Sequence, residues 1–193
     1  YTLDEVIPTS NYCKANGLNI HLDGARIFNA LVETNESTID WGRHFDTISI
    51  CLSKSLGAPV GSLLLGTKDK IKEARRFRKV MGGGMRQAGY LAAAGIFALE
   101  NNIPKLKIDN DRAKHIGKIL SSLPFVQELK PVQSNIVIFK LQDDIRDQDF
   151  IQILKQNGIL AVPFGDNTIR FVFHLDITEN MVEQLEQILP TLI

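Results

Sequence analysis

The sequence predicts an α/β domain followed by a smaller α+β domain. Short, strongly apolar runs alternate with helical segments over the first hundred residues, which is typical of a sheet covered by helices. Short strands and helices in a less regular order fill the rest of the chain and indicate a separate α+β unit. We place the boundary close to residues 101–104, which divides the chain into 1–102 and 103–193.

Local signals define the elements of the first part. Thr2 and Glu5 have the spacing of a capping box, so a helix is expected from residue 3 until the Asn16-Gly17 stop. We expect the strands of this part to be buried on both faces, because they are apolar throughout. The expected elements are helix 3–16, strand 19–22, helical segment 27–32, a turn or short helix at 39–43, strand 47–52, strand 61–66, basic helix 68–80 and Ala-rich helix 87–100.

The second part is punctuated by turn residues. Gly158 ends one expected helix, Gly165-Asp166-Asn167 joins two strands, and Thr178 caps the closing helix. The expected elements are helix 110–123, strand 136–141, helix 147–157, strands 160–163 and 168–173, and helix 178–189.

Composition excludes several classes of protein. The 193 residues carry 22 basic and 22 acidic side chains, so bulk charge gives no argument for a nucleic-acid or membrane partner. No apolar run approaches the roughly 20 residues of a membrane span. Cys13 and Cys51 form neither a metal spacing nor a disulfide framework, which favours a reducing compartment, the cytoplasm. Because Tyr1 opens the chain at the start of a helix, we expect a C-terminal piece of a longer protein.

Lys54 is the first candidate for chemistry. It follows the apolar run 47–52 and lies in a turn that contains Gly57 and Pro59. Lysine is costly to desolvate, so a lysine directly after a buried strand is usually paired, neutral or covalently engaged. An amine with a lowered pKa is a nucleophile toward aldehydes, as Schiff-base enzymes require. The alternative is a surface lysine in a turn.

Asp23 is the second candidate. It ends another short apolar run, in the fragment Ile20-His21-Leu22-Asp23-Gly24-Ala25-Arg26. A strand-end aspartate and a strand-end lysine together form the protein half of a pyridoxal 5′-phosphate site, in which the aspartate pairs with the pyridinium nitrogen. The alternative role for Asp23 is a helix N-cap for the segment that begins at Ala25. We therefore predict pyridoxal 5′-phosphate as the cofactor and no metal.

Four motifs in this order resemble the low-specificity L-threonine aldolase family. This family is a branch of the aspartate-aminotransferase-like, fold type I pyridoxal phosphate enzymes. The resemblance implies that residues 1–102 are the C-terminal part of the cofactor-binding large domain and 103–193 the small C-terminal domain. The motifs are His21-Leu22-Asp23-Gly24-Ala25-Arg26, Ser53-Lys54-Ser55-Leu56-Gly57-Ala58-Pro59-Val60-Gly61, Gly82-Gly83-Gly84-Met85-Arg86-Gln87-Ala88-Gly89 and Arg170-Phe171-Val172-Phe173-His174-Leu175-Asp176.

The resemblance also implies the role of each site residue. Lys54 forms the Schiff base with the cofactor, and Asp23 keeps the pyridine nitrogen protonated. Ser53 and Arg86 would contact the phosphate, although Ser53 could instead cap the turn and Arg86 could be a solvated arginine. Arg26 and Arg170 would grip the substrate α-carboxylate, for which guanidinium is well suited. For Arg170 the alternative is an ordinary exposed arginine on a strand.

The implied reaction is cleavage of the Cα–Cβ bond of L-threonine or L-allo-threonine to glycine and acetaldehyde, in a homo-oligomer that is a dimer or tetramer. One departure from the family pattern matters. The Gly-Thr phosphate loop and the ring-stacking histidine belong to the family's first half and are absent here, so a missing N-terminal segment has to supply them. Two alternatives stay open: a β-eliminating lyase or aminotransferase of the same fold, and a catalytically incomplete C-terminal fragment that only packs against a partner segment.

Overall fold

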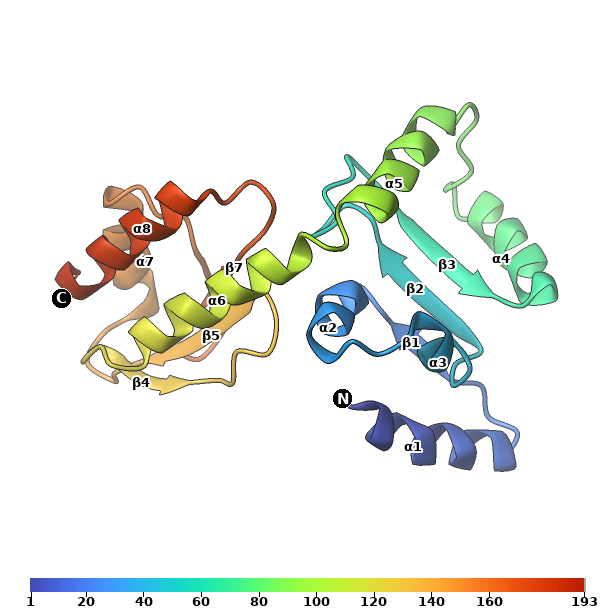
Figure 1. The fold of residues 1–193 in the computed structure, drawn as a ribbon, viewed down its shortest axis with the longest axis horizontal. Coiled ribbons are helices and arrows are strands. Elements are labelled where there is room, and N and C mark those ends of the chain that lie inside the picture. Colours follow the sequence, from blue (N-terminus) through green and yellow to red (C-terminus); the bar gives the residue numbers. More distant parts are fainter. Residues whose placement is uncertain (193) are drawn as a thin grey trace. The chain divides into compact units, whose positions relative to one another are not determined.

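A computed structural model describes residues 1–192 (Figure 1). The chain divides into two compact units, Tyr1–Pro104 and a second unit that begins at Lys105. Each unit has its own sheet, and we describe them separately.

The N-terminal unit contains a three-stranded sheet in the order β1-β2-β3 (Figure 1). Strand β1 is parallel to β2, whereas β3 is antiparallel to β2. The loop between β2 and β3 therefore starts at the carboxyl end of β2, next to the end of β1. The elements are α1 (Leu3–Ala15), β1 (His21–Asp23), α2 (Ile27–Thr34), α3 (Thr38–Gly42), β2 (Thr47–Cys51), β3 (Ser62–Gly66), α4 (Lys68–Val80) and α5 (Gly89–Asn101).

Local hydrogen bonds confirm the predicted ends of α1. The Glu5 side chain accepts from the Thr2 backbone N–H at 2.8 Å, and the Thr2 hydroxyl accepts from the Glu5 N–H at 3.4 Å. At the other end Gly17 has a φ of 66°, and the Leu18 N–H donates to the Cys13 carbonyl at 2.8 Å. This is the capping box at one end and the glycine-stopped Schellman turn at the other, both built from residues close in sequence.

The prediction that every strand of this unit is buried on both faces is wrong for β1, in which His21 and Asp23 are exposed, and most clearly for β3. All of its residues are exposed, and Leu63, Leu64 and Leu65 keep 38%, 43% and 44% of their surface. The sheet order leaves β3 with only β2 as a partner in the described part of the chain. An apolar strand is buried only when other segments cover it, so its sequence alone does not decide its exposure.

The C-terminal unit contains a four-stranded antiparallel sheet in the order β4-β5-β7-β6 (Figure 1). Helix α6 begins at Leu106, four residues before the predicted start at residue 110. Strand β4 is present in the structure and is not among the predicted elements. Both features depend on tertiary packing, since Leu106 is fully buried and β4 pairs with β5. The elements are α6 (Leu106–Leu120), β4 (Val126–Leu129), β5 (Ile136–Leu141), α7 (Asp147–Gln156), β6 (Val162–Pro163), β7 (Thr168–Val172), α8 (Glu179–Ile188) and the 3-10 helix η1 (Leu189–Thr191).

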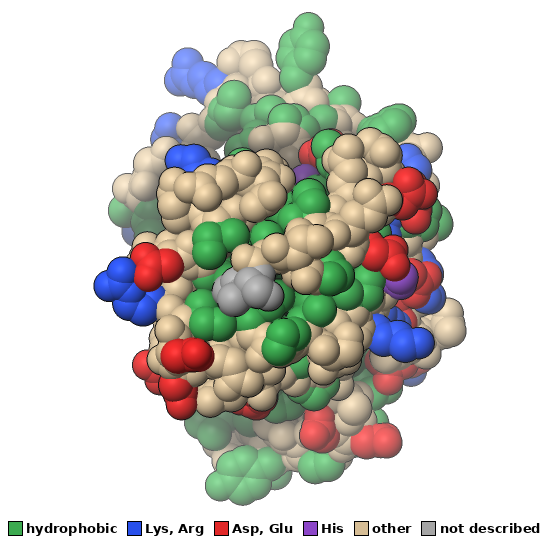
Figure 2. Space-filling model, turned by 90° about the vertical axis from the view of Figure 1, so that its left-hand side faces the viewer, with side chains coloured by type: hydrophobic (Ala, Val, Ile, Leu, Met, Phe, Trp, Pro, Cys, Tyr) green, Lys and Arg blue, Asp and Glu red, His purple; other side chains and the backbone are tan. Residues whose placement is uncertain are grey.

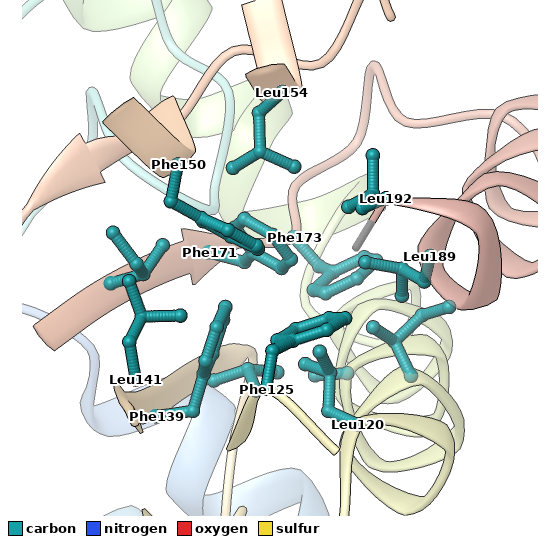
Figure 3. Packing of buried hydrophobic residues seen from close by; sticks show 14 of the residues in the cluster. Leu120, Phe125, Phe139, Leu141, Phe150, Leu154, Phe171, Phe173, Leu189 and Leu192 are labelled. Carbon is teal, nitrogen blue, oxygen red and sulfur yellow. The ribbon is translucent and has the colours of Figure 1, made fainter. Parts of the chain in front are cut away.

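An aromatic cluster forms the core of the C-terminal unit (Figure 3). The Phe139 ring lies edge-on to Phe171, with ring centres 5.3 Å apart, and Phe150 lies 5.1 Å from Phe125. Along β5 and β7 buried residues alternate with half-buried ones, so one face of the sheet packs against the helices. The opposite face carries Arg170 of β7 and its neighbour on β5, Ile138.

Charged side chains of both signs surround hydrophobic ones on the side of the molecule in Figure 2. Two side-chain contacts join α6 to α8: an ion pair between Arg112 and Glu179, and a hydrogen bond between His115 Nε2 and Glu186 Oε2, each at 3.0 Å. Among the described residues, no helix combines the length and the apolar character that a membrane crossing requires.

Candidate active site

Lys54 lies in a closed loop between β2 and β3. The Leu52 N–H donates to the Gly61 carbonyl at 2.9 Å, the Ala58 N–H to the Leu52 carbonyl at 3.0 Å, and the Gly57 N–H to the Lys54 carbonyl at 2.9 Å. Leu52 and Ala58 are buried, whereas Lys54 is exposed. The loop thus points its apolar side chains into the protein and leaves the lysine amine accessible.

Helix α5 and the residue that follows it hold this loop in place through two contacts. The side chain of Leu52 packs so closely on Gly95 that a Cβ at that position would lie 3.0 Å from the leucine Cδ1. The Asn102 side-chain amide, just after α5, donates to the Leu56 carbonyl at 2.9 Å. Two anchors, one apolar and one polar, therefore fix the loop that carries Lys54.

Asp23 is the last residue of β1 and lies opposite Ser49 of the neighbouring strand. Because β1 and β2 are parallel, Asp23 and the loop containing Lys54 leave the sheet at the same edge, where α/β proteins place their ligands. The next residue turns the chain sharply, since the Gly24 N–H donates to the Ser49 carbonyl at 2.8 Å. A Cβ on Gly24 would also lie 2.8 Å from that carbonyl oxygen, which explains the glycine after the aspartate.

The carboxylate of Asp23 is exposed, and one of its two oxygens accepts a hydrogen bond from a neighbouring backbone N–H. Its Oδ1 accepts from the Ala25 N–H at 3.2 Å, which closes a local turn. This is not the helix N-cap considered as an alternative, because α2 begins at Ile27 and its N-cap position is Arg26. Its Oδ2 has no hydrogen bond to the described residues. An accessible carboxylate oxygen at the carboxyl edge of the sheet fits the pyridinium nitrogen of pyridoxal phosphate, so the local turn and the cofactor role are compatible.

Arg26 is half-buried one turn beyond Asp23, at the start of α2. Its carbonyl accepts from the Asn29 N–H at 3.0 Å. Together with Asp23 and Gly24 it lines a cavity of about 690 Å³ that α1 bounds on another side. Lys54 is not part of this lining. Arg26 is therefore next to Asp23, and the structure does not place it beside the lysine.

Ser53 and Arg86 are both exposed, as residues that contact a phosphate have to be. Ser53 precedes Lys54 in the closed loop, where its N–H donates to the Gly61 carbonyl at 3.3 Å. Arg86 follows the three glycines of the α4–α5 connection and forms no hydrogen bond or ion pair with the described residues. In the described part of the chain, neither a hydrogen bond nor an ion pair joins Arg86 to the loop that carries Lys54.

Arg170 lies in the C-terminal unit, whereas the other predicted site residues belong to the N-terminal unit. Its Nε is buried and has no hydrogen-bond partner among the described residues. Its guanidinium carbon lies 5.0 Å from the centre of the Phe164 ring. The sequence reading missed Phe164, although an aromatic residue beside the Gly165-Asp166-Asn167 turn is a signal that could have been noticed.

A comparison with known proteins matches the part of the chain that contains most of these motifs. The sequence profile of the beta-eliminating lyase family matches residues 1–144. The chain belongs to this family. The matched region contains the lysine loop, the Asp23-Gly24 turn and the glycines before Arg86, whereas Arg170 lies beyond it.

Relatives and solved structures confirm the resemblance to threonine aldolases and the fold type I architecture. A Schizosaccharomyces pombe protein named "Probable low-specificity L-threonine aldolase" is 40% identical over 97% of this chain and 47% of its own length. A Leishmania major threonine aldolase structure aligns with a TM-score of 0.81 at 25% identity, covering 100% of this chain and 57% of that chain. A histidinol-phosphate aminotransferase from Clostridium acetobutylicum shares the fold, with a TM-score of 0.70 at 15% identity over 97% of this chain and 58% of its own. The chain spans about half the length of the curated relatives it matches.

Proposed function

We propose that this chain supplies the lysine-bearing half of a pyridoxal 5′-phosphate-dependent lyase. The proposed reaction cleaves the Cα–Cβ bond of L-threonine or L-allo-threonine to give glycine and acetaldehyde. One observation carries the proposal: two parallel neighbouring strands deliver an exposed aspartate and an exposed lysine to the same edge of the sheet.

Each predicted cofactor-binding residue has its own role in the proposed site. Lys54 would hold the cofactor covalently through Nζ, which its fixed loop keeps accessible. The free oxygen of Asp23 would hold a proton on the pyridine nitrogen. Ser53 would donate its hydroxyl hydrogen to the phosphate, and Arg86 would contribute positive charge to it. When bound, the cofactor supplies an electron sink for the pair of electrons released at Cα.

Arg26 and Arg170 would bind and orient the substrate through its α-carboxylate. A planar guanidinium with parallel N–H donors matches a carboxylate better than a lysine ammonium does. Arg170 has the properties that such a role requires, because it is half-buried and its Nε is not used by the protein. Holding the carboxylate also fixes which bond to Cα is presented for cleavage, a preference expressed in the transition state.

The choice of reaction follows from the degree of similarity. The relative at 40% identity is named a threonine aldolase, whereas the aminotransferase structure at 15% identity supports only the fold. The aldolase is therefore our proposal, and transamination or β-elimination is not favoured. We assign the base for the β-hydroxyl proton to the remainder of the enzyme, where the family resemblance places the ring-stacking histidine.

A further segment, corresponding to the rest of the relatives' length, would complete the site with the phosphate loop and the ring-stacking group. The exposed leucines of β3 support this, because they leave apolar side chains uncovered on both faces of the strand in the unit that carries Lys54. A homo-oligomer, a dimer or tetramer, is proposed from the family resemblance. A cytoplasmic location is proposed because Cys13 and Cys51 are both free.

Borohydride reduction tests cofactor attachment. The chain is incubated with pyridoxal phosphate, alone and with the N-terminal half of the Schizosaccharomyces pombe relative added as a separate polypeptide. We expect a pyridoxyl adduct on Lys54 by peptide mass spectrometry, increased by the added half. The variant Lys54→Gln should lose the adduct, and Lys79→Gln, which changes an exposed lysine of α4, should keep it. An adduct distributed over many lysines would contradict the proposal.

Product analysis then tests the reaction. With L-threonine the complemented protein should release acetaldehyde and glycine in equal amounts. Formation of a keto acid with ammonia, or with an aminated cofactor, would replace the aldolase by β-elimination or transamination. If cofactor attaches and no product forms under any condition, the chain is a catalytically silent fragment.

A further inference from the structure

Phe164 is an aromatic residue that lies against Arg170, a candidate site residue. It is 50% exposed and lies outside the hydrophobic cluster of its unit. Its ring centre is 5.0 Å from the guanidinium carbon of Arg170, within the range of a cation–π contact. A half-exposed phenylalanine contributes little to a core, so this contact calls for a separate explanation.

The backbone that presents Phe164 is unusually constrained. Gly165, Asp166 and Asn167 have successive φ values of 81°, 36° and 56°, a left-handed run that non-glycine residues rarely adopt. Two hydrogen bonds close the turn, from the Phe164 N–H to the Thr168 carbonyl and from the Thr168 N–H to the Gly165 carbonyl, both at 2.8 Å. The strained turn thus sets where the ring lies.

Asn167 ties this turn to the rest of the unit. Its side-chain amide donates to the carbonyls of Gln142 and Ile145, at 3.1 and 2.6 Å. Its side-chain oxygen accepts from the Asp147 N–H at 2.8 Å, at the first residue of α7. Three hydrogen bonds from one side chain therefore fix the turn, and with it Phe164, to the β5–α7 connection and to the first residue of α7.

Arg170 needs such a support. Its Nε is buried without a hydrogen-bond partner, and no ion pair with a described residue holds its guanidinium. An arginine side chain has many rotamers, and ordering it at the moment of binding weakens the affinity for a ligand. A ring stacked on one face of the guanidinium restricts those rotamers while its edge donors stay available to a carboxylate.

We propose that Phe164 is a positioning residue that pre-orders the Arg170 guanidinium for the carboxylate of an amino-acid ligand. The ligand class rests on the proposed function, whereas the stacking itself does not. Phe164 touches neither substrate nor cofactor in this proposal and acts through Arg170. Replacing the ring should weaken carboxylate binding about two- to fivefold, the range that corresponds to one exposed cation–π contact.

Side-chain NMR of the 193-residue chain tests the stacking without cofactor or turnover. In the wild-type chain we expect nuclear Overhauser contacts between the Phe164 ring and the Arg170 side chain, and an upfield ring-current shift of its Nε–H proton. Phe164→Leu should abolish the shift and accelerate solvent exchange of that proton, whereas Phe164→Trp should retain both properties. Phe77→Leu, which removes another exposed ring from α4, should leave the Arg170 signals unchanged.

Titration with L-threonine, followed through the same Nε–H signal, tests the ligand. Phe164→Leu should raise the apparent Kd about two- to fivefold, and Phe164→Trp should restore it. Identical Arg170 signals in the wild type and in Phe164→Leu, or the absence of ring contacts in the wild type, would overturn the proposal. If the ring contacts are present but threonine does not shift Arg170 in the wild type, the stacking holds and the carboxylate role of Arg170 fails.

Discussion

The two units differ in how completely they bury their apolar residues. The C-terminal unit encloses a continuous core in which Phe139, Phe150 and Leu154 have no exposed surface (Figure 3). The N-terminal unit buries Val6, Leu31 and Trp41 in one small cluster and Leu52 and Leu56 beside Lys54, while the leucines of β3 remain exposed. The C-terminal unit carries one predicted site residue, Arg170. The N-terminal unit carries all the others.

This contrast shows where the folding free energy of the chain resides. Buried apolar area is the main favourable term in folding, so the C-terminal unit should be stable by itself. The N-terminal unit relies on capped helices, a short sheet and the closed loop around Lys54. Apolar surface exposed beside a binding site is a place where further protein can pack.

The largest expected effect tests this contrast directly. Phe150→Ala should destabilise the C-terminal unit by about 3–5 kcal/mol, because it leaves a cavity in a closed core. Leu64→Ala on β3 should cost about 0.5 kcal/mol or less, since that side chain is already 43% exposed. Urea unfolding, followed by core methyl NMR signals for the C-terminal unit and by Trp41 fluorescence for the N-terminal unit, measures both. Equal losses in the two variants would contradict the contrast.

A smaller effect is expected at the turn after Asp23. Gly24→Ala should destabilise the N-terminal unit by about 1–3 kcal/mol, because the new Cβ would meet the Ser49 carbonyl oxygen at 2.8 Å. Gly42→Ala is the matched control, since a Cβ there has no neighbour within 4 Å. Trp41 fluorescence during urea unfolding reports both variants. A tolerated Gly24→Ala with no loss of stability would show that β1 and β2 yield more easily than the structure indicates.

The smallest effect is a pH dependence of the C-terminal unit. Burial raises the pKa of the Asp109 carboxyl above its ordinary value, although the charges of Arg112 and His174 act in the opposite direction and that of Asp176 adds to the rise. An acid whose folded pKa exceeds its unfolded pKa binds protons more tightly when folded, so stability falls as pH rises between those two values. The loss is complete above the folded pKa.

The variant Asp109→Asn should therefore flatten the stability profile of this unit as pH rises from about 4 toward neutrality. Urea midpoints at a series of pH values, read from the core methyl signals, test this. Asp111→Asn on the same helix is the control, because that carboxylate is exposed and pairs with Lys107. A profile that Asp109→Asn leaves unchanged would show that the buried carboxyl does not titrate in this window.

Much of the local structure was predictable from residues close together in sequence. The bounds of α4 and β5 agree with the prediction at both ends, and Thr178 caps α8 through a hydrogen bond from the Met181 N–H at 3.3 Å. The start of α6, the pairing of β4 and the exposure of β3 were not predictable in this way. Each of them depends on segments that lie far apart in the chain.

The candidate site divides in the same manner. Its residue types and their order were available from the sequence, because a strand-end aspartate, a strand-end lysine and the glycines around them form recognisable motifs. The sequence could not place Phe164 against Arg170, since that contact depends on a turn that Asn167 ties to α7 and to the β5–α7 connection.

The sequence by itself determined the family, the helix caps and turns, and the identity of the residues proposed to bind cofactor and substrate. These features depend on side-chain chemistry and on hydrogen bonds that span a few residues. Only the tertiary structure decided which strands are parallel, which apolar strand stays exposed, and which arginine is stacked. Those outcomes depend on burial and pairing between distant segments, whose free energy exists only once the chain has folded.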